Sequence, residues 1–460
     1  KAYFGKIATS GMLKSLYDFE NREGLFPTVD SRFKFCLLTL APKDGMSDFA
    51  FFLHNLTELE DSRRHFTMTP EDFDLINPNT HTCPVFRSEE DAKLAKKIYK
   101  KAGVFVNETD EENGNPWKIK FSTMYHMSND SGLFINEKKK DYLPLYEAKM
   151  MHQFDHRWNT FVNGEPKDVT VEQKEDINFT VTPQYYVPYA ESVLRATTLD
   201  LKIVQALREL IIENEKLKSE DNSASAVGER SRTDKKLREL IREKAGMSDD
   251  LFSENEELES GESNIENKEL KILNSQLSTL NSKELGKAVF EVAEKLCPKY
   301  LMGYRGITNV TNERTVISSV IPFSGVGHSM LLYSVKQPST LAACLLANFL
   351  SVELDVIARM KLGGTNLTYG YFRQFPVLPP SAYHEVAQNF IVPRVMALTY
   401  TATDMTEWAK ALWNESSLKM RLKMLQLNNK ENEGITDEKF VDREFTESFL
   451  PPYIFDDAKR

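Results

Sequence analysis

The densest group of side chains capable of chemistry lies within residues 142–161. Its members are Lys149, His152, Gln153, Asp155, His156 and Arg157. The two histidines, four residues apart, would share one face of a helix, which is the spacing of a metalloprotease zinc pair. Glutamine stands where that motif needs a glutamate base and no third ligand follows, so we expect no metal site. Two interpretations stay open: contact with nucleic acid, which these side chains suit, or buried hydrogen-bonded pairs such as Asp155 with Arg157.

A second polar run covers residues 308–315 and contains Asn309, Asn312 and Arg314. Asparagine can pair with adenine through two hydrogen bonds, and arginine can pair with guanine in the same way. The run therefore predicts contacts with base edges. The alternative is structural: Asn312, Glu313 and Arg314 would satisfy one another and the backbone of a turn.

A third stretch, residues 361–369, follows an apolar segment and includes two adjacent glycines. The residues of interest are Lys361, Gly363, Gly364, Thr365 and Asn366. Glycines let backbone amides approach a phosphate closely, and the same residues are typical of a helix C-cap. With further basic residues they predict a basic cleft on an acidic body. Its expected members are Lys149, Arg157, Arg305, Arg314, Lys361 and Arg373.

Composition limits the classes of protein to consider. At 460 residues the chain has room for two to four domains. Its net charge of −10 argues against indiscriminate coating of nucleic acid but permits a local basic cleft. No apolar run approaches the ~18–20 residues of a membrane helix, so we expect no membrane partner. The four cysteines lack C-x-x-C spacing and suggest neither a zinc ribbon nor a disulfide framework, so we expect a cytoplasmic location. We expect Cys36 and Cys344 to be small core residues.

The elements that must position these side chains follow from hydrophobic patterning. Residues 13–19, 33–40 and 49–53 predict strands of an α/β sheet with a helix before the first. The almost wholly apolar run 33–40 predicts a strand covered on both faces. Residues 88–101 predict a helix that begins at a capping signal and ends at Gly103.

The later segments differ in the secondary structure that they predict. Residues 104–195 predict mixed strands and loops, and an amphipathic helix is expected from residue 201. Residues 249–266 contain eight acidic residues and no basic residue, typical of a solvated insertion. A strand is expected over 315–322, one long helix over 339–360, and mainly helices over 381–460.

Several sequence blocks occur in the order found in one enzyme family. They are SLYDFEN at 15–21 with LFP at 25–27, VDSRFKF at 29–35, NPW at 115–117, the stretch 142–161, YYVP at 185–188, ITNVTNERTV at 307–316, GVGHS at 325–329, KLGGTNL at 361–367, FPVLPP at 375–380 and ALTYTA at 397–402. Together they resemble the Eco57I-like adenine-specific DNA methyltransferases of restriction-modification and phage-defence systems. The acidic region at about 212–285 lies outside the resemblance.

The resemblance implies an enzyme that transfers a methyl group from S-adenosylmethionine to adenine N6 in double-stranded DNA. Its catalytic motif, Asn-Pro-Pro followed by an aromatic residue, and its glycine-rich cofactor loop do not occur here. Asn115 and Pro116 match only the first two letters, and we interpret them as a turn. We therefore expect a segment that is inactive alone, carries no cofactor or metal site, and works with an N-terminal catalytic half of the same protein.

The expected fold is α+β, in five parts. They are the last strands of a methyltransferase sheet at 1–68, a target-recognition domain at 69–200 and 286–380, a helical, acidic insertion at 201–285 within that domain, and a helical segment at 381–460. The predicted function is target DNA recognition. One alternative is an interaction module that docks other subunits of a defence complex. Another is the recognition part of a fused nuclease, although we find no Asp…Glu-x-Lys metal site.

Overall fold

The structure is a computed structural model that describes residues 2–42, 45–197, 290 and 293–456, and it has mixed α+β architecture. Contacts divide the chain into two units. Unit 1 comprises Lys1–Ser131, Leu145–Gln184 and Tyr300–Arg460, and unit 2 comprises Gly132–Pro144 and Tyr185–Lys299. The expected α+β class is confirmed. The five-part division stays a prediction, and its insertion, 201–285, lies wholly outside the described residues.

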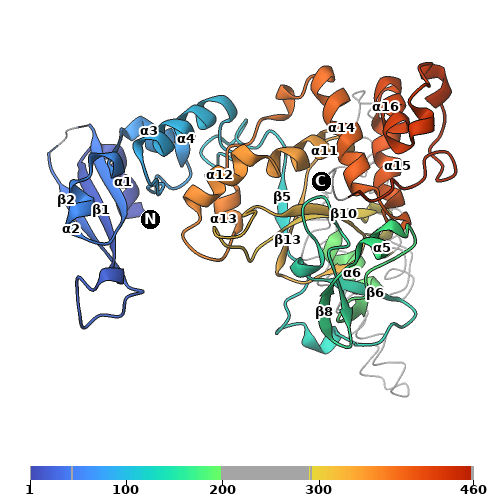
Figure 1. Ribbon diagram of the computed structural model, residues 1–460, viewed down its shortest axis with the longest axis horizontal. Coiled ribbons are helices and arrows are strands. Elements are labelled where there is room, and N and C mark those ends of the chain that lie inside the picture. The colour runs from blue at the N-terminus through green and yellow to red at the C-terminus, as the bar shows by residue number, and fades with distance from the viewer. Residues whose placement is uncertain (1, 43–44, 198–289, 291–292, 457–460) are drawn as a thin grey trace, which may run out of the picture. The chain divides into compact units, whose positions relative to one another are not determined.

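Unit 1 begins with a four-stranded sheet (Figure 1). Its elements are α1 (Ala2–Ser10), β1 (Leu13–Glu20), β2 (Lys34–Leu40), β3 (Ser47–Leu53) and β4 (Phe66–Met68). The strand order is β2-β1-β3-β4, with β1 parallel to β3 and the other pairs antiparallel. Aromatic rings of β3 and β4 stack in the core beneath α1, with Phe49 and Phe66 centroids 5.3 Å apart. The three predicted strands and the helix before them are confirmed.

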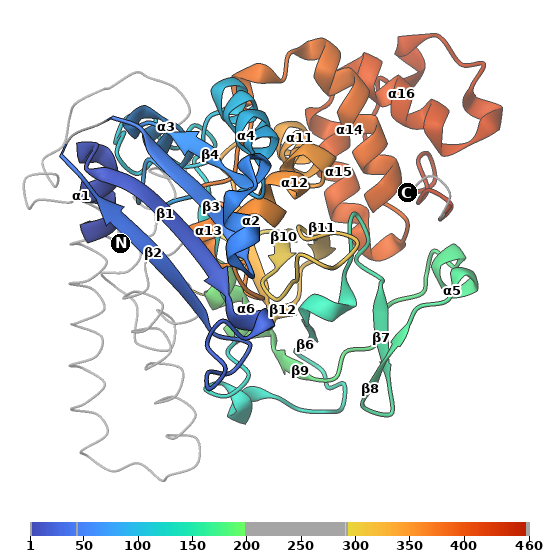
Figure 2. The same ribbon diagram turned by 60° about the vertical axis from the view of Figure 1, so that its left-hand side comes forward.

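Strand β2 differs from the prediction in its surroundings. It pairs only with β1, and among the described residues it forms the open edge of the sheet (Figure 2). Leu37 is 49% exposed and Leu38 is 46% exposed, although they point to opposite faces. Cys36 is also exposed. The expectations of a strand covered on both faces and of a core Cys36 are therefore wrong, because apolar composition cannot tell a central strand from an uncovered edge.

Helix α2 (Leu56–Glu60) lies between β3 and β4 in the chain, and helices α3 (Pro70–Ile76) and α4 (Glu89–Ala102) follow the sheet. The Ser88 hydroxyl accepts the Asp91 amide, 3.2 Å away, at the start of α4, and Gly103 ends the helix with a φ of 71°. The predicted helix at 88–101 is thus confirmed, together with both of its end signals.

A second sheet in unit 1 is antiparallel throughout, with the order β11-β10-β13-β5. Its strands are β5 (Lys120–Ser122), β10 (Tyr300–Arg305), β11 (Ser318–Pro322) and β13 (Met330–Ser334). Helices pack against it to form the largest core of the molecule. They are α11 (Ser339–Phe349), α12 (Val352–Lys361), α13 (Tyr369–Phe372), α14 (Glu385–Thr399), α15 (Thr406–Glu415) and α16 (Leu418–Asn428). Cys344 is buried there, as expected.

The single long helix expected over 339–360 is two helices. Helices α11 and α12 meet at Leu350 and Ser351 with a bend of 57°. The Ser351 hydroxyl accepts a hydrogen bond from the Leu354 amide over 3.2 Å and so caps the start of a new helix. Among the described residues, no single helix is long and apolar enough to cross a membrane, although this bent pair passes that test by length and composition.

The stretch 142–161 is largely extended rather than helical. Strand β6 (Tyr142–Tyr146) leads to a 3-10 turn at Ala148–Met150 and then to β7 (Asn159–Val162), which forms a hairpin with β8 (Glu165–Asp168) before α5 (Val171–Glu175). Within unit 1, Leu145 and Tyr146 pair with β12 (Gly325–Val326). The shared helix face suggested by the spacing of His152 and His156 does not exist, because a tight bridge from His152 to Asp155 turns the chain.

Unit 2 is described at its two ends. The first residues of β6 pair with β9 (Tyr186–Pro188), and α6 (Tyr189–Ala196) follows directly. The Tyr189 hydroxyl donates to the Glu294 carboxylate over 2.8 Å. This bond ties the two described parts of unit 2 together.

Candidate nucleic-acid interface

Two of the three predicted contact stretches lie side by side. They occupy the segment after β10 (residues 306–316) and the segment after α12 (residues 363–367), and we call these the paired loops. The Leu367 amide donates to the Gly306 carbonyl over 2.7 Å, and the Thr308 amide donates to the Thr365 carbonyl over 2.9 Å. Residues about 60 positions apart in sequence thus share one polar surface of unit 1.

Helix α12 holds the first loop in place through two side chains that sequence reasoning did not single out. The Asp355 carboxylate accepts hydrogen bonds from the amides of Thr315 and Val316 at 2.8 and 2.9 Å. The Arg359 guanidinium pairs with Asp355 and donates to the carbonyls of Val310, Asn312 and Glu313 at 2.6–2.8 Å. The available signal was the spacing of Asp355 and Arg359, four residues apart on one helix face.

Within the first of the paired loops, Thr308 donates to the Thr315 carbonyl and Asn309 accepts a hydrogen bond from the Thr311 amide, but four other polar side chains of the paired loops have no such use in the described part of the chain. Among the described residues, no hydrogen-bond or ion-pair partner contacts the side chains of Asn312, Arg314, Thr365 or Asn366. Asn312, Thr365 and Asn366 are exposed and Arg314 is partly exposed. A Cβ built on the exposed Gly364 would meet no atom within 4 Å. This surface therefore presents amide, hydroxyl and guanidinium groups to solvent on a fixed backbone.

Part of the first stretch adjoins the paired loops. Arg305 donates to the Met151 carbonyl, and burial lowers the pKa of Arg305 to about 10. The Gln153 amide donates to the Val316 carbonyl over 3.3 Å. The ring of His152 stacks on Trp158 at 4.2 Å. Lys149 is exposed and pairs with Glu147 at 3.3 Å.

The remaining members of the first stretch point inward. His156 is 1% exposed and bonds the Asp404 carboxylate over 2.8 Å. Arg157 is fully buried and donates to the carbonyls of Lys174, Asp176 and Thr401, among others, at 2.7–2.9 Å. A buried guanidinium surrounded by carbonyl oxygens crosslinks chain segments and is not available to DNA. For these two residues the structure favours the buried-pair interpretation.

The buried-pair interpretation gave Asp155 with Arg157 as its example. In the structure, the Asp155 carboxylate contacts a backbone amide and a lysine. Asp155 accepts the backbone amide of Arg157 over 2.8 Å, while its other carboxylate oxygen pairs with the Lys174 ammonium at 2.9 Å. Lys174 is also buried and lies 4.6 Å from the ring centroid of Trp158. The ion pair that the structure shows for Asp155 is with Lys174, and its hydrogen bond with Arg157 is to the backbone amide.

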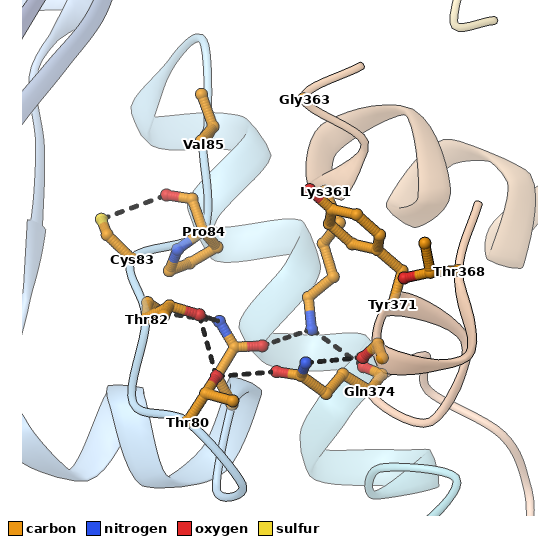
Figure 3. Close-up of a pocket in the computed structure, with 12 residues that line it drawn as sticks. Thr80, Thr82, Cys83, Pro84, Val85, Lys361, Gly363, Thr368, Tyr371 and Gln374 are labelled. Carbon is orange, nitrogen blue, oxygen red and sulfur yellow. Dashed lines mark hydrogen bonds between the residues drawn. The ribbon is translucent and has the colours of Figure 1, made fainter. Parts of the chain in front are cut away.

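Lys361 is likewise internal. Its ammonium donates to the Ile76 carbonyl at 3.0 Å and the Asn77 side-chain oxygen at 2.6 Å. It also donates to the Gln374 carbonyl at 2.8 Å (Figure 3). Burial lowers the pKa of Lys361 well below its usual range. Arg373 is partly exposed and pairs with Glu108. A basic cleft built from all six predicted cations does not form, because Arg157 and Lys361 are used to hold the core together.

Within the described ranges, no group of three or more His, Cys, Asp or Glu side chains is placed to hold a metal ion. No protein-family model matches the chain, and a comparison with curated proteins finds no match.

Proposed function

We propose that this chain recognises target DNA for a site-specific N6-adenine methyltransferase that uses S-adenosylmethionine in the intact protein. The observation that carries the proposal is the surface of the paired loops. The side chains of Asn312, Arg314, Thr365 and Asn366 have no partner among the described residues, yet the backbone of the first loop is clamped by Asp355 and Arg359. Preorganised polar groups lose little entropy when they bind, which suits a recognition surface.

The chemistry of these groups matches base and phosphate recognition. The amides of Asn309, Asn312 and Asn366 are suited to adenine edges, and the Arg314 guanidinium is suited to guanine. The exposed Gly363 and Gly364 leave room for a phosphate to approach their backbone amides. Gln153, His152, Lys149 and Arg305 extend the same surface, whereas His156, Arg157 and Lys361 support it from inside.

The proposed partner is a catalytic half that carries the Asn-Pro-Pro motif and the S-adenosylmethionine loop. Support comes from β2, whose unpaired edge and apolar residues on both faces suit a neighbouring strand and covering layer. The charges beside this edge are paired within the chain, since Glu20 contacts both Arg22 and Lys34. A largely apolar surface with paired charges fits protein better than DNA.

A binding assay with sequence variants tests the recognition surface. Arg314→Ala should weaken binding to the cognate duplex by about 1–3 kcal/mol, or roughly 5- to 150-fold, because one base contact is lost. Arg63→Ala is the matched control, since Arg63 is exposed, pairs with Asp61 and lies outside the paired loops. Fluorescence anisotropy with a randomised duplex pool, followed by selected sites, measures both. Equal affinities for Arg314→Ala and wild type, or no duplex binding at all, would contradict the proposal.

The second candidate is an interaction module for other defence-complex subunits. The exposed apolar residues of β2 favour it, because soluble monomers rarely expose contiguous apolar surface. Deleting residues 219–281, which lie outside the described residues, separates the two candidates. Loss of a partner protein with DNA binding intact would favour the interaction module.

A further inference from the structure

A cavity of about 310 Å³ lies in unit 1 next to the paired loops. Figure 3 shows segment 80–85 on one side and segment 361–374 on the other. Its volume is that of roughly ten water molecules at liquid density, within the range of small-ligand pockets. The lining residues are Asn77, Thr80, Thr82, Cys83, Pro84, Val85, Lys361, Gly363, Thr368, Gly370, Tyr371 and Gln374.

The one charged side chain among the lining residues of the cavity is basic. None of its lining residues is acidic, and the Lys361 ammonium is balanced by carbonyl-type oxygens alone. No carboxylate pairs with Lys361 among the described residues, and its nearest aromatic contact is the Tyr99 ring, 4.8 Å from ring centroid to ammonium. Burial lowers the pKa of Lys361, but its three oxygen acceptors require the three N–H bonds of the ammonium form. A buried ammonium without a counter-charge produces a positive potential that an entering anion would compensate.

The walls offer both hydrogen-bonding and apolar surfaces. Thr80, Thr82 and Thr368 contribute hydroxyl groups, with the first two oxygens 2.9 Å apart. The Thr368 hydroxyl and the Tyr371 hydroxyl have no hydrogen-bond partner among the described residues. The Tyr371 ring, Pro84 and Val85 add apolar surface. Hydroxyl donors and a positive potential suit a phosphate, while an aromatic ring and apolar walls suit a nucleobase.

We propose that this cavity binds a single nucleotide, with its phosphate attracted by Lys361 and held by the threonine and tyrosine hydroxyls. Gly363 lines the cavity and also belongs to the paired loops, so the ligand has two possible sources with the same chemistry. One is a free mononucleotide. The other is a nucleotide turned out of a bound duplex, and this source rests on the proposed function.

The first experiment uses the full chain and adenosine 5′-monophosphate, with titration calorimetry as the readout. Gly370→Phe should fill the cavity and weaken binding at least tenfold. A Cβ at Gly370 has only the Thr368 hydroxyl nearby, at 3.7 Å, so the backbone accepts the change. Gly434→Phe is the matched control, because Gly434 has no atom within 4 Å of its added Cβ, does not line the cavity, and should leave binding unchanged.

Two further comparisons guard against misfolding and define the ligand. Thr368→Val keeps the side-chain volume and should weaken binding of the monophosphate severalfold without changing thermal stability. Adenosine and inorganic phosphate should each bind at least tenfold more weakly than the monophosphate. Equal affinity of Gly370→Phe and wild type for the monophosphate would overturn the proposal for both sources, because the nucleotide would then bind elsewhere.

The second experiment compares a duplex carrying one bulged nucleotide with a perfect duplex. Wild type and Gly434→Phe should prefer the bulged duplex, and Gly370→Phe should lose this preference. If the monophosphate binds but no duplex does, the pocket stands and the proposed function fails. If duplexes bind in a sequence-dependent way while neither the monophosphate nor the bulge is preferred, the pocket proposal fails and the proposed function stands.

Discussion

The side chains of His156 and Asp404 illustrate how polar residues work in this protein. They join residues 248 positions apart through one 2.8 Å bond, and His156 is almost fully buried. Burial raises the pKa of Asp404, but the charges of His156 and Arg157 and the hydrogen bond from His156 outweigh it. The net pKa therefore lies below its usual 3.8. This pair stabilises the fold and holds the segment around His156 in place beneath the candidate interface.

Replacing Asp404 should expose this role. Asp404→Asn should lower the free energy of unfolding near pH 7 by about 3 kcal/mol, because it leaves a buried partner uncompensated. Since the folded state lowers the carboxyl pKa, the stabilisation is full above pH 3.8 and is lost as pH falls through the folded value. The difference between variant and wild type should therefore shrink below about pH 4. Urea denaturation at several pH values measures it.

The matched control for this variant is Asp442→Asn, because Asp442 is exposed and should change stability by less than about 0.5 kcal/mol. A pH-independent difference between Asp404→Asn and wild type would show that the carboxylate charge is not what matters.

At the scale of elements, the break between α11 and α12 decides the geometry of the candidate interface. Ser351 restarts the helix at a new angle, and the new direction places Asp355 and Arg359 against the loop after β10. A continuous helix would carry these residues along a different axis. A local capping interaction thus controls where a distant loop is held.

Arg359→Ala should release that loop while leaving the fold intact. Three carbonyl acceptors would lose their donor, and we expect a loss of about 1–3 kcal/mol in the free energy of unfolding. Hydrogen exchange of the amides at residues 310–316 should accelerate, and duplex affinity should fall more than the stability loss alone explains. Glu353→Ala, on an exposed position of the same helix, is the control. Unchanged exchange in Arg359→Ala would rule out the clamp.

At the scale of the whole molecule, a net charge of −10 means that the proposed DNA binding must be local. Two of the six predicted cations, Arg157 and Lys361, are buried in hydrogen-bonded positions. At most four therefore remain for phosphates or bases: Lys149, Arg305, Arg314 and Arg373.

The salt dependence of duplex binding measures how many of these cations contact phosphate groups. With two to four phosphate contacts, the slope of log affinity against log salt concentration should lie at roughly −2 to −4. Arg314→Ala should reduce the slope by about one if Arg314 contacts phosphate, and should leave it unchanged if Arg314 reads a base. Arg63→Ala should leave it unchanged. A slope near zero would exclude electrostatic contact with the duplex, and one steeper than about −6 would require cations outside this surface.

Local signals in the sequence were sufficient for many elements. Strands β1 and β3, helix α4 with its caps, and the contact-prone loops at 308–315 and 361–366 follow from periodicity, capping residues and polar runs, which depend on neighbours a few positions away. The surroundings of each element in the fold could not be predicted from these local signals. Strand β2 is a strand as its composition predicts, but only the sheet order makes it an edge.

The sequence by itself thus determined which residue types lie at the paired loops and that the chain mixes helices with strands. Only the tertiary structure decided which polar residues face solvent. Lys361 donates to carbonyl groups near residue 76, and Arg157 donates to one at Thr401, so their burial depends on segments that are 285 and 244 positions away. A buried cation is stable only where such acceptors converge, and that convergence is a property of the folded chain. Within the part of the chain that the structure describes, the same packing leaves Asn312 and Arg314 unpaired at the surface, which is why the proposed DNA contacts centre there.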